Sequence, residues 1–266
     1  MAQLLLRGSP FVACEIEAVL FDKDGTLCHS EPRLLALAQA RVVHCQWLLS
    51  ERHPELAAAV VCELGPRLEA TYGLQGDAIH PAGTTAVASR EHNLISTATA
   101  LAQLGLGWPE ALDLAEVVFA HTDRRDSSPN DSGSDPAPGT TPGLEQILQQ
   151  LNSAGVACAV ISNDDQQGIE SFLTSHNLHN SFVALRSADH WPRKPDPAAV
   201  ADLCSELGVE PGRCALIGDA NSDLVMGERA GVGLVLGYSA GWRQRPPLAP
   251  RFPQLAHWRE LEVRCA

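Results

Sequence analysis

Four acidic residues follow two short apolar runs of the sequence, at residues 16–21 and 214–217: Asp22, Asp24, Asp219 and Asp223. Two like charges about 4 Å apart repel each other by about 4 kcal/mol at an effective dielectric constant of about 20. If the fold brings the four carboxylates together, they therefore require a cation. Oxygen ligands without a nearby histidine or cysteine favour a hard ion, and Mg²⁺ is the expected one because it keeps several waters and shares its shell with phosphate.

One lysine is expected to add a fixed positive charge beside these acids. Of the 19 basic residues only Lys23 and Lys194 are lysines, and an ammonium differs from a guanidinium in being a compact point charge. Lys194 could also be a solvated charge on a loop. That alternative is disfavoured because the chain uses arginine almost everywhere else.

A serine ends a third apolar run, at residues 156–161. Ser162 is expected to lie near the acids, because polar residues that end parallel strands collect at one edge of the sheet. Residues 162–164 are also of the types common in loops and at the N-cap of a helix, here one that begins at Gln166. The residues alone leave both interpretations of Ser162 open.

The elements that must position these residues alternate between strand and helix. Apolar runs that predict strands lie at 16–21, 156–161 and 214–217, with weaker ones at 182–185 and 233–236. Helical patterns lie between them at 142–152, 166–176, 197–207 and 223–230. This alternation predicts an α/β fold with a Rossmann-like parallel sheet that is covered by helices on both faces.

A segment of different character interrupts this alternation. Residues 28–122 carry helical patterns at 32–49, 54–72, 86–104 and 109–121 without a strand of comparable quality, which predicts an all-α domain. Residues 123–139 are rich in Ser, Asp, Pro and Gly and are predicted to be a flexible linker. Residues 1–27 and 140–266 would then form the α/β core, and its tail after Gly241 is predicted to be a loop with one helix near 254–263.

Composition narrows the class of protein. The chain has 266 residues, so one or two domains are expected. The net charge of −13 argues against a nucleic-acid partner. No apolar run has the length of a membrane span or of a signal-peptide core, and the eight cysteines form no CxxC pair. We therefore expect a cytoplasmic protein with reduced cysteines and no membrane partner, while its oligomeric state stays open.

Four motifs in order carry a resemblance to a known family: DKDGT at 22–26, Ser162, Lys194 in RKPDP, and GDANSD at 218–223. With them the sequence resembles the haloacid dehalogenase-like (HAD-like) hydrolase superfamily. It looks most like the phosphoglycolate phosphatase-like members, whose helical cap domain is inserted after the first motif. The resemblance implies a HAD-like fold for the core and a cap role for residues 28–122.

The resemblance also implies a covalent mechanism. Asp22 would attack the phosphorus and form an aspartyl-phosphate. Asp24 would protonate the leaving alkoxide and then take a proton from the hydrolytic water. Thr26 is expected to hold Asp24 through a local hydrogen bond, whereas Lys23 is expected to point away from the two acids and receives no role.

The binding groups follow from the same resemblance. Mg²⁺ would be held by the Asp22 carboxylate, the Asp24 backbone carbonyl, Asp219 and Asp223. Ser162 and the backbone amide of Asn163 would bind phosphoryl oxygens, and Lys194 would bridge the nucleophile and the phosphate.

The implied function is a magnesium-dependent phosphatase for a small phosphorylated metabolite, with phosphoglycolate or a sugar phosphate as the implied substrate. The second acid argues against a dehalogenase, which has no alkoxide to protonate. A sugar-phosphate mutase and a non-catalytic phosphate-binding or protein-binding relative are the alternatives. Within the insertion Arg33, Arg90 and His92 could contact substrate, but a solvated helix face is the favoured interpretation of each.

Overall fold

The computed structural model describes residues 2–7, 13–56, 58–126 and 138–265. The chain divides into two compact units, one of Met1–Ser30 with Ala137–Ala266 and one of Glu31–Pro136. The first is built around a sheet and the second around helices.

The α/β unit is centred on a parallel sheet. Within the described residues this sheet has six strands in the order β10-β9-β8-β3-β6-β7, and every neighbouring pair in it is parallel. The strands are β3 (Ala18–Phe21), β6 (Ala157–Ile161), β7 (Ala184–Arg186), β8 (Cys214–Gly218), β9 (Leu234–Tyr238) and β10 (Gln254–Leu255). The predicted parallel α/β fold is confirmed.

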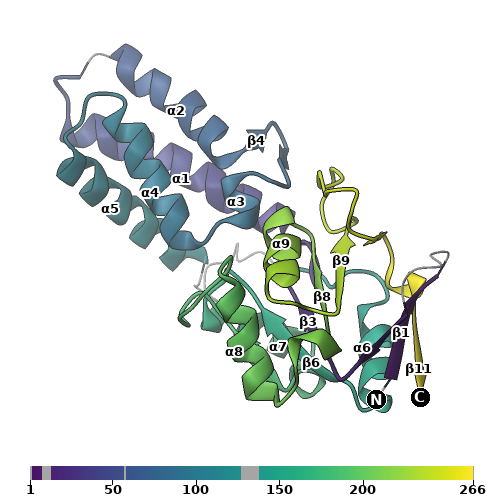
Figure 1. Ribbon diagram of the computed structural model, residues 1–266. Coiled ribbons are helices and arrows are strands. Elements are labelled where there is room, and N and C mark those ends of the chain that lie inside the picture. Colours follow the sequence, from purple (N-terminus) through teal and green to yellow (C-terminus); the bar gives the residue numbers. More distant parts are fainter. Residues whose placement is uncertain (1, 8–12, 57, 127–137, 266) are drawn as a thin grey trace. The chain divides into compact units, whose positions relative to one another are not determined.

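Helices cover both faces of this sheet (Figure 1): α6 (Leu144–Ser153), α7 (Gln166–Ser175), α8 (Pro197–Leu207) and α9 (Asn221–Arg229). Alternate residues of the central strand β3 enter opposite apolar layers. Val19 and Phe21 pack in the layer that holds residues of α6 and α7, and Ala18 and Leu20 pack in the layer that holds residues of α8 and α9. A strand buried on both faces needs apolar residues at every position, which explains the uninterrupted run in the sequence.

Local signals set the ends of α8 where the sequence predicts them. The side chain of Asp196 accepts a hydrogen bond from the backbone N–H of Ala198 at 2.9 Å, and Pro197 occupies the first turn. The helix ends at Gly208, whose φ of 67° is left-handed. Two short 3₁₀ turns, η1 (His179–Ser181) and η2 (Pro211–Arg213), lead into β7 and β8.

The chain ends form a second sheet that the sequence pattern did not indicate. Strands β1 (Ala2–Leu6), β2 (Ala13–Ile16) and β11 (Leu261–Cys265) pair antiparallel in the order β11-β1-β2. The helix expected near 254–263 is therefore wrong, because this stretch contains β10, the 3₁₀ turn η3 (Trp258–Glu260) and β11. Pairing between β1 and β11 brings the two chain ends side by side (Figure 1), and such long-range pairing leaves little trace in a local pattern.

The second unit is mainly helical: α1 (Glu31–Arg52), α2 (Ala58–Tyr72), α3 (Thr84–Val87), α4 (Arg90–Ala102) and α5 (Trp108–Asp126). Its own apolar cluster includes Leu49, Leu68 and Phe119. The expected all-α character needs one correction, since β4 (Leu74–Gln75) and β5 (Ala78–Ile79) form a small hairpin. None of the helices in the described ranges combines the length and apolar character needed to cross a membrane.

The predicted linker also needs correction at both ends. Residues 123–126 continue α5, and Asp123 forms ion pairs there with Arg41 at 3.0 Å and with Arg90 at 2.6 Å. At the other end the carbonyl of Pro138 accepts a hydrogen bond from His176 Nε2 at 2.9 Å. Residues 127–137 of the predicted linker lie outside the described residues.

Trp258 fastens the C-terminal segment to the α/β core. Its ring stacks on Tyr238 with centroids 4.7 Å apart and meets Phe21 edge-on at 5.7 Å. Its indole N–H donates to Thr141 Oγ1 at 2.8 Å. The side chain is almost fully buried. It therefore links the C-terminal segment to β3 through Phe21, to β9 through Tyr238, and to Thr141 before α6.

Truncation of this residue is expected to destabilise the α/β unit. Trp258→Ala should lower the free energy of unfolding by about 3–5 kcal/mol, because it leaves a large cavity and removes a buried hydrogen bond to Thr141. Urea unfolding followed by circular dichroism measures the change. The exposed Trp191 is the matched control, and Trp191→Ala should change stability by about 0.5 kcal/mol or less; equal losses would remove Trp258 from this role.

Candidate active site

The predicted site residues follow neighbouring strands at the carboxyl edge of the sheet. Asp22 follows β3, and its backbone N–H donates to the carbonyl of Ile217 in β8 at 2.9 Å. Asp219 directly follows β8, and Ser162 directly follows β6 on the other side of β3. Parallel pairing of β3 with both neighbours therefore brings three distant stretches of chain to one edge.

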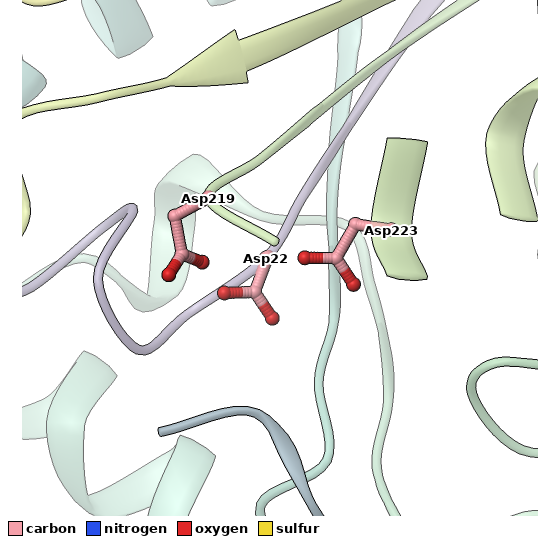
Figure 2. Close-up of side chains that lie close together, drawn as sticks. All are labelled: Asp22, Asp219 and Asp223. Atoms are coloured by element: carbon pink, nitrogen blue, oxygen red, sulfur yellow. The ribbon is translucent and has the colours of Figure 1, made fainter. Parts of the chain in front are cut away.

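Three carboxylates meet at this edge. Asp22, Asp219 and Asp223 each offer an oxygen within 4.8 Å of the others, and all three side chains are buried. Figure 2 shows their carboxylates close together, with Asp223 projecting from α9. An all-oxygen, anionic and buried set matches what Mg²⁺ prefers, so the residues present fit a hard divalent cation.

Lys194 enters the same cluster from the loop before α8. Its ammonium lies 2.6 Å from Asp22 Oδ1 and 2.7 Å from Asp223 Oδ1, and it donates to the carbonyl of Ile161 at 3.3 Å. Burial alone would lower the pKa of Lys194, but the two adjacent carboxylates raise it above its usual value. The ammonium therefore stays charged and joins the loop before α8 to β3, β6 and α9.

The buried carboxylates resist ionisation. Burial raises the pKa of Asp22 from 3.8 to about 6, although Lys194 opposes the rise and Asp223 adds to it. Burial likewise raises the pKa of Asp219 well above its usual value, with further contributions from Asp22 and Asp223. A bound cation would relieve this repulsion, which is the electrostatic property expected of a metal site.

Two donors orient Asp219. The indole N–H of Trp242 donates to Asp219 Oδ2 at 2.5 Å, and Thr26 Oγ1 donates to Asp219 Oδ1 at 3.3 Å. Thr26 was expected to hold Asp24, so that assignment is wrong: the turn after Asp24 directs the hydroxyl toward β8. Trp242 was missed, since it stands outside every motif and only the folded chain places it beside Asp219.

Gly25 makes room for this arrangement. Its φ of 77° lies in the left-handed region, which glycine adopts without a steric penalty. A Cβ at this position would overlap the indole of Trp242 and the carboxylate of Asp219. The glycine of the DKDGT motif thus serves both the backbone turn and the close approach of Trp242.

Asp24 lies apart from the three clustered carboxylates. Its Oδ1 accepts hydrogen bonds from Lys23 Nζ at 2.6 Å and from the hydroxyl of Ser30. Within the described chain, then, three rather than four carboxylates meet at the candidate metal site. Lys23 was expected to point away from both acids, and for Asp24 this is wrong, because the chain turns after β3 and strict alternation stops.

Ser162 is buried at the end of β6. Its backbone N–H donates to the carbonyl of Arg186 at 2.9 Å, and its Oγ accepts from the N–H of Asp164 at 3.1 Å. A hydroxyl that accepts one hydrogen bond keeps its own hydrogen for donation. The N-cap of α7 is Asp165, whose side chain accepts from the N–H of Gly168, so the capping interpretation of Ser162 does not hold.

Comparison with known families supports the motif assignment. The family model "haloacid dehalogenase-like hydrolase" matches residues 16–231. This range contains all of the site residues predicted from the motifs and the helical unit between them.

Curated relatives share part of the sequence. A phosphoglycolate phosphatase of Psychrobacter arcticus is 29% identical over 136 residues, which cover 50% of this chain and 56% of that protein. One of Pseudomonas putida is 34% identical over 104 residues, which cover 38% of each chain. The chain therefore spans about half or less of the length of these relatives.

Solved structures share the fold. A predicted phosphoglycolate phosphatase from Haemophilus somnus superimposes with a TM-score of 0.61 at 19% identity, covering 90% of this chain and 94% of that one. A HAD-superfamily hydrolase from Geobacter sulfurreducens gives a TM-score of 0.53 at 18% identity, covering 93% and 95%. At such identities the similarity concerns the fold alone.

Divalent cations are expected to stabilise the protein in a pH-dependent way. The pKa of Asp22 is raised to about 6, so the folded state binds this proton more tightly than the unfolded state and metal-free stability falls as pH rises from about 4 to about 6. Mg²⁺ competes with this proton for the Asp22 carboxylate. Calorimetric melting with Mg²⁺ and with chelator should therefore show a larger rise in Tm at about pH 8 than at about pH 5; an equal rise at both would contradict the cluster as the binding site.

The hydrogen bond from Trp242 is expected to support metal binding. Trp242→Phe keeps an aromatic ring but removes the N–H donor, and loss of a partner of a metal ligand typically costs about 10–100-fold in affinity. Isothermal titration with Mg²⁺ measures the affinity directly. Trp191→Phe serves as the control on an exposed tryptophan, and an unchanged affinity in Trp242→Phe would show that Asp219 needs no such donor.

Proposed function

The chain belongs to the haloacid dehalogenase-like hydrolase family, and on that basis we propose that it is a magnesium-dependent phosphatase of small phosphate monoesters that works through an aspartyl-phosphate. The observation that carries this proposal is the contact of Lys194 with Asp22 and Asp223 inside a buried carboxylate cluster. Phosphoryl transfer requires chiefly positioning and neutralisation of charge, and this cluster is suited to both.

Asp22 is the proposed nucleophile. One of its carboxylate oxygens forms a bond to the phosphorus while the bond from phosphorus to the ester oxygen breaks. Lys194, 2.6 Å from Asp22 Oδ1, fixes the direction of the carboxylate and offers positive charge to the phosphoryl group.

Asp24 is the proposed general acid and base. It gives a proton to the departing alkoxide, and it then takes a proton from the water that attacks the aspartyl-phosphate. Inorganic phosphate leaves and the Asp22 carboxylate is restored. The side chain of Asp24 is half-buried and lies outside the carboxylate cluster, as a group that must exchange protons with substrate and water requires.

The remaining site residues are proposed to bind the metal ion and the phosphoryl group. Asp22, Asp219 and Asp223, with the Asp24 carbonyl, would hold Mg²⁺, which when bound neutralises the charge of the phosphoryl group. Ser162 and the backbone amide of Asn163 are the proposed donors to phosphoryl oxygens. Ser162 directly follows Ile161, whose carbonyl accepts from Lys194, and this neighbourhood supports the assignment.

The domain assignment and the substrate belong to the same proposal. The sequence-based domains are 1–27 with 140–266 as the core and 28–122 as the cap, and we propose the helical unit as the part that selects the ester. Phosphoglycolate or a sugar phosphate is the proposed substrate. Curated relatives named phosphoglycolate phosphatase support this choice, and a cytoplasmic location remains an expectation from sequence.

Removal of the nucleophile tests the function. Asp22→Asn should abolish the Mg²⁺-dependent hydrolysis of p-nitrophenyl phosphate, because an amide does not attack phosphorus, while circular dichroism should show an intact fold. Chelation of Mg²⁺ should abolish the wild-type activity as well.

Asp202→Asn is the control, since Asp202 is a half-exposed carboxylate of α8 that pairs with Arg186 of β7. It should retain wild-type turnover. Full activity of Asp22→Asn would remove Asp22 from its role, and a wild-type protein without metal-dependent turnover on phosphate esters would favour a non-catalytic relative.

A further inference from the structure

Lys23 is a buried cation to which the mechanism gives no task. Its side chain is 2% exposed, and its ammonium lies 2.6 Å from Asp24 Oδ1 and 3.0 Å from Asp164 Oδ2. Burial of an ammonium is costly unless charged partners compensate it. A lysine in this place therefore requires both carboxylates, and in return it constrains both.

The two carboxylates belong to different loops. Asp24 lies on the loop after β3, and Asp164 lies on the loop after β6. Asp164 is itself fixed, because its Oδ1 accepts from the N–H of Asp165 at 3.0 Å and its backbone carbonyl accepts from the N–H of Ala188 at 2.8 Å. Lys23 thus ties Asp24 to a loop that is anchored independently.

Gly168 makes space for this anchor. A Cβ at Gly168 would overlap the carboxylate of Asp164, so the first turn of α7 admits that carboxylate only because a glycine stands there. The aromatic ring of Phe172, about one turn further along α7, lies 6.0 Å from the Lys23 ammonium. The ammonium is therefore held by α7 and its preceding loop as well as by Asp24.

Among the hydrogen bonds to Asp24 Oδ1, the one from Lys23 comes from a charged donor. Ser30 contributes a hydroxyl and Cys28 a thiol at 3.8 Å. Charge-assisted hydrogen bonds are about twice as strong as neutral ones, and a thiol is a weak donor. Of these three donors, the ammonium therefore restrains the direction of the carboxylate most strongly.

We propose that Lys23 is a positioning residue that holds the Asp24 carboxylate in place for proton transfer to the leaving group. The proposal rests on the proposed function, in which Asp24 is the general acid. It implies that Lys23 supports departure of the alcohol and contributes little to nucleophilic attack by Asp22. Loss of Lys23 should then matter more for an ester whose leaving group needs protonation than for one whose leaving group does not.

A pair of aryl phosphates of similar shape tests this implication. Phenyl phosphate releases a more basic oxygen than p-nitrophenyl phosphate, and kcat/KM reports the step in which the leaving group departs. Lys23→Met, which keeps the apolar stem, should lower kcat/KM for phenyl phosphate by about 10-fold or more, a part of the roughly 10²–10⁴-fold that general acid catalysis contributes. The loss with p-nitrophenyl phosphate should be several times smaller.

A double-mutant cycle distinguishes an effect of Lys23 that acts through Asp24 from a nonspecific disturbance of the site. In the Asp24→Asn background Lys23→Met should leave the ratio of the two kcat/KM values unchanged, because its effect passes through Asp24. Asp164→Asn, which weakens the anchor but keeps Lys23, should shift the ratio in the same direction as Lys23→Met and carries the test if Lys23→Met does not fold. Arg213→Met removes a cation at the opposite end of β8 and should leave the ratio at the wild-type value.

The outcomes distinguish this inference from the function on which it rests. Equal losses with both esters, or an equal shift in the Asp24→Asn background, would overturn the role of Lys23. If Asp24→Asn changes the ratio and Lys23→Met does not, the role of Lys23 fails while the proposed mechanism stands. If Asp24→Asn itself leaves the ratio unchanged, the general acid is misassigned and the proposed mechanism fails.

Discussion

Repulsion among buried carboxylates is the constraint that organises this site. Asp22, Asp219 and Asp223 are packed within 4.8 Å of one another, and Lys194 supplies one positive charge among them. Three negative charges and one positive charge leave a formal charge of −2 on these four described side chains. That imbalance is what a divalent cation would cancel, so the fit of this cluster to such a cation follows from its burial and its charge together.

Such a cluster must be held by the surrounding structure, because its members repel. The parallel strands β3 and β8 fix the positions of Asp22 and Asp219, and the first turn of α9 fixes Asp223. Trp242 and Thr26 fix the direction of the Asp219 carboxylate. These restraints come from three separate stretches of chain, at residues 18–26, 214–229 and 242, so the site exists only in the folded α/β unit.

Two carboxylates that stand two residues apart receive opposite environments. Asp22 is turned into the carboxylate cluster beside Lys194, whereas Asp24 is turned to Lys23 and Ser30. Different surroundings allow neighbouring carboxyl groups to take different roles, as proposed for this pair. The two lysines of the chain thus stand one beside each of the two acids.

The sequence by itself determined the α/β class, the central strands and three of the acids that meet beside Lys194, whereas Asp24, expected as a fourth, lies apart from them. The strands and the acids follow from apolar runs that end in polar residues, which are local signals produced by neighbouring residues. Lys194 follows from the scarcity of lysine in the chain and from its RKPDP motif. Tertiary structure alone decided the β1–β11 pairing, the contact of Trp242 with Asp219, the donation from Thr26 to Asp219 instead of Asp24, and the engagement of Lys23 with Asp24 and Asp164. The physical reason is that side-chain direction after a strand depends on where the chain turns and on what packs against it, and distant segments determine both.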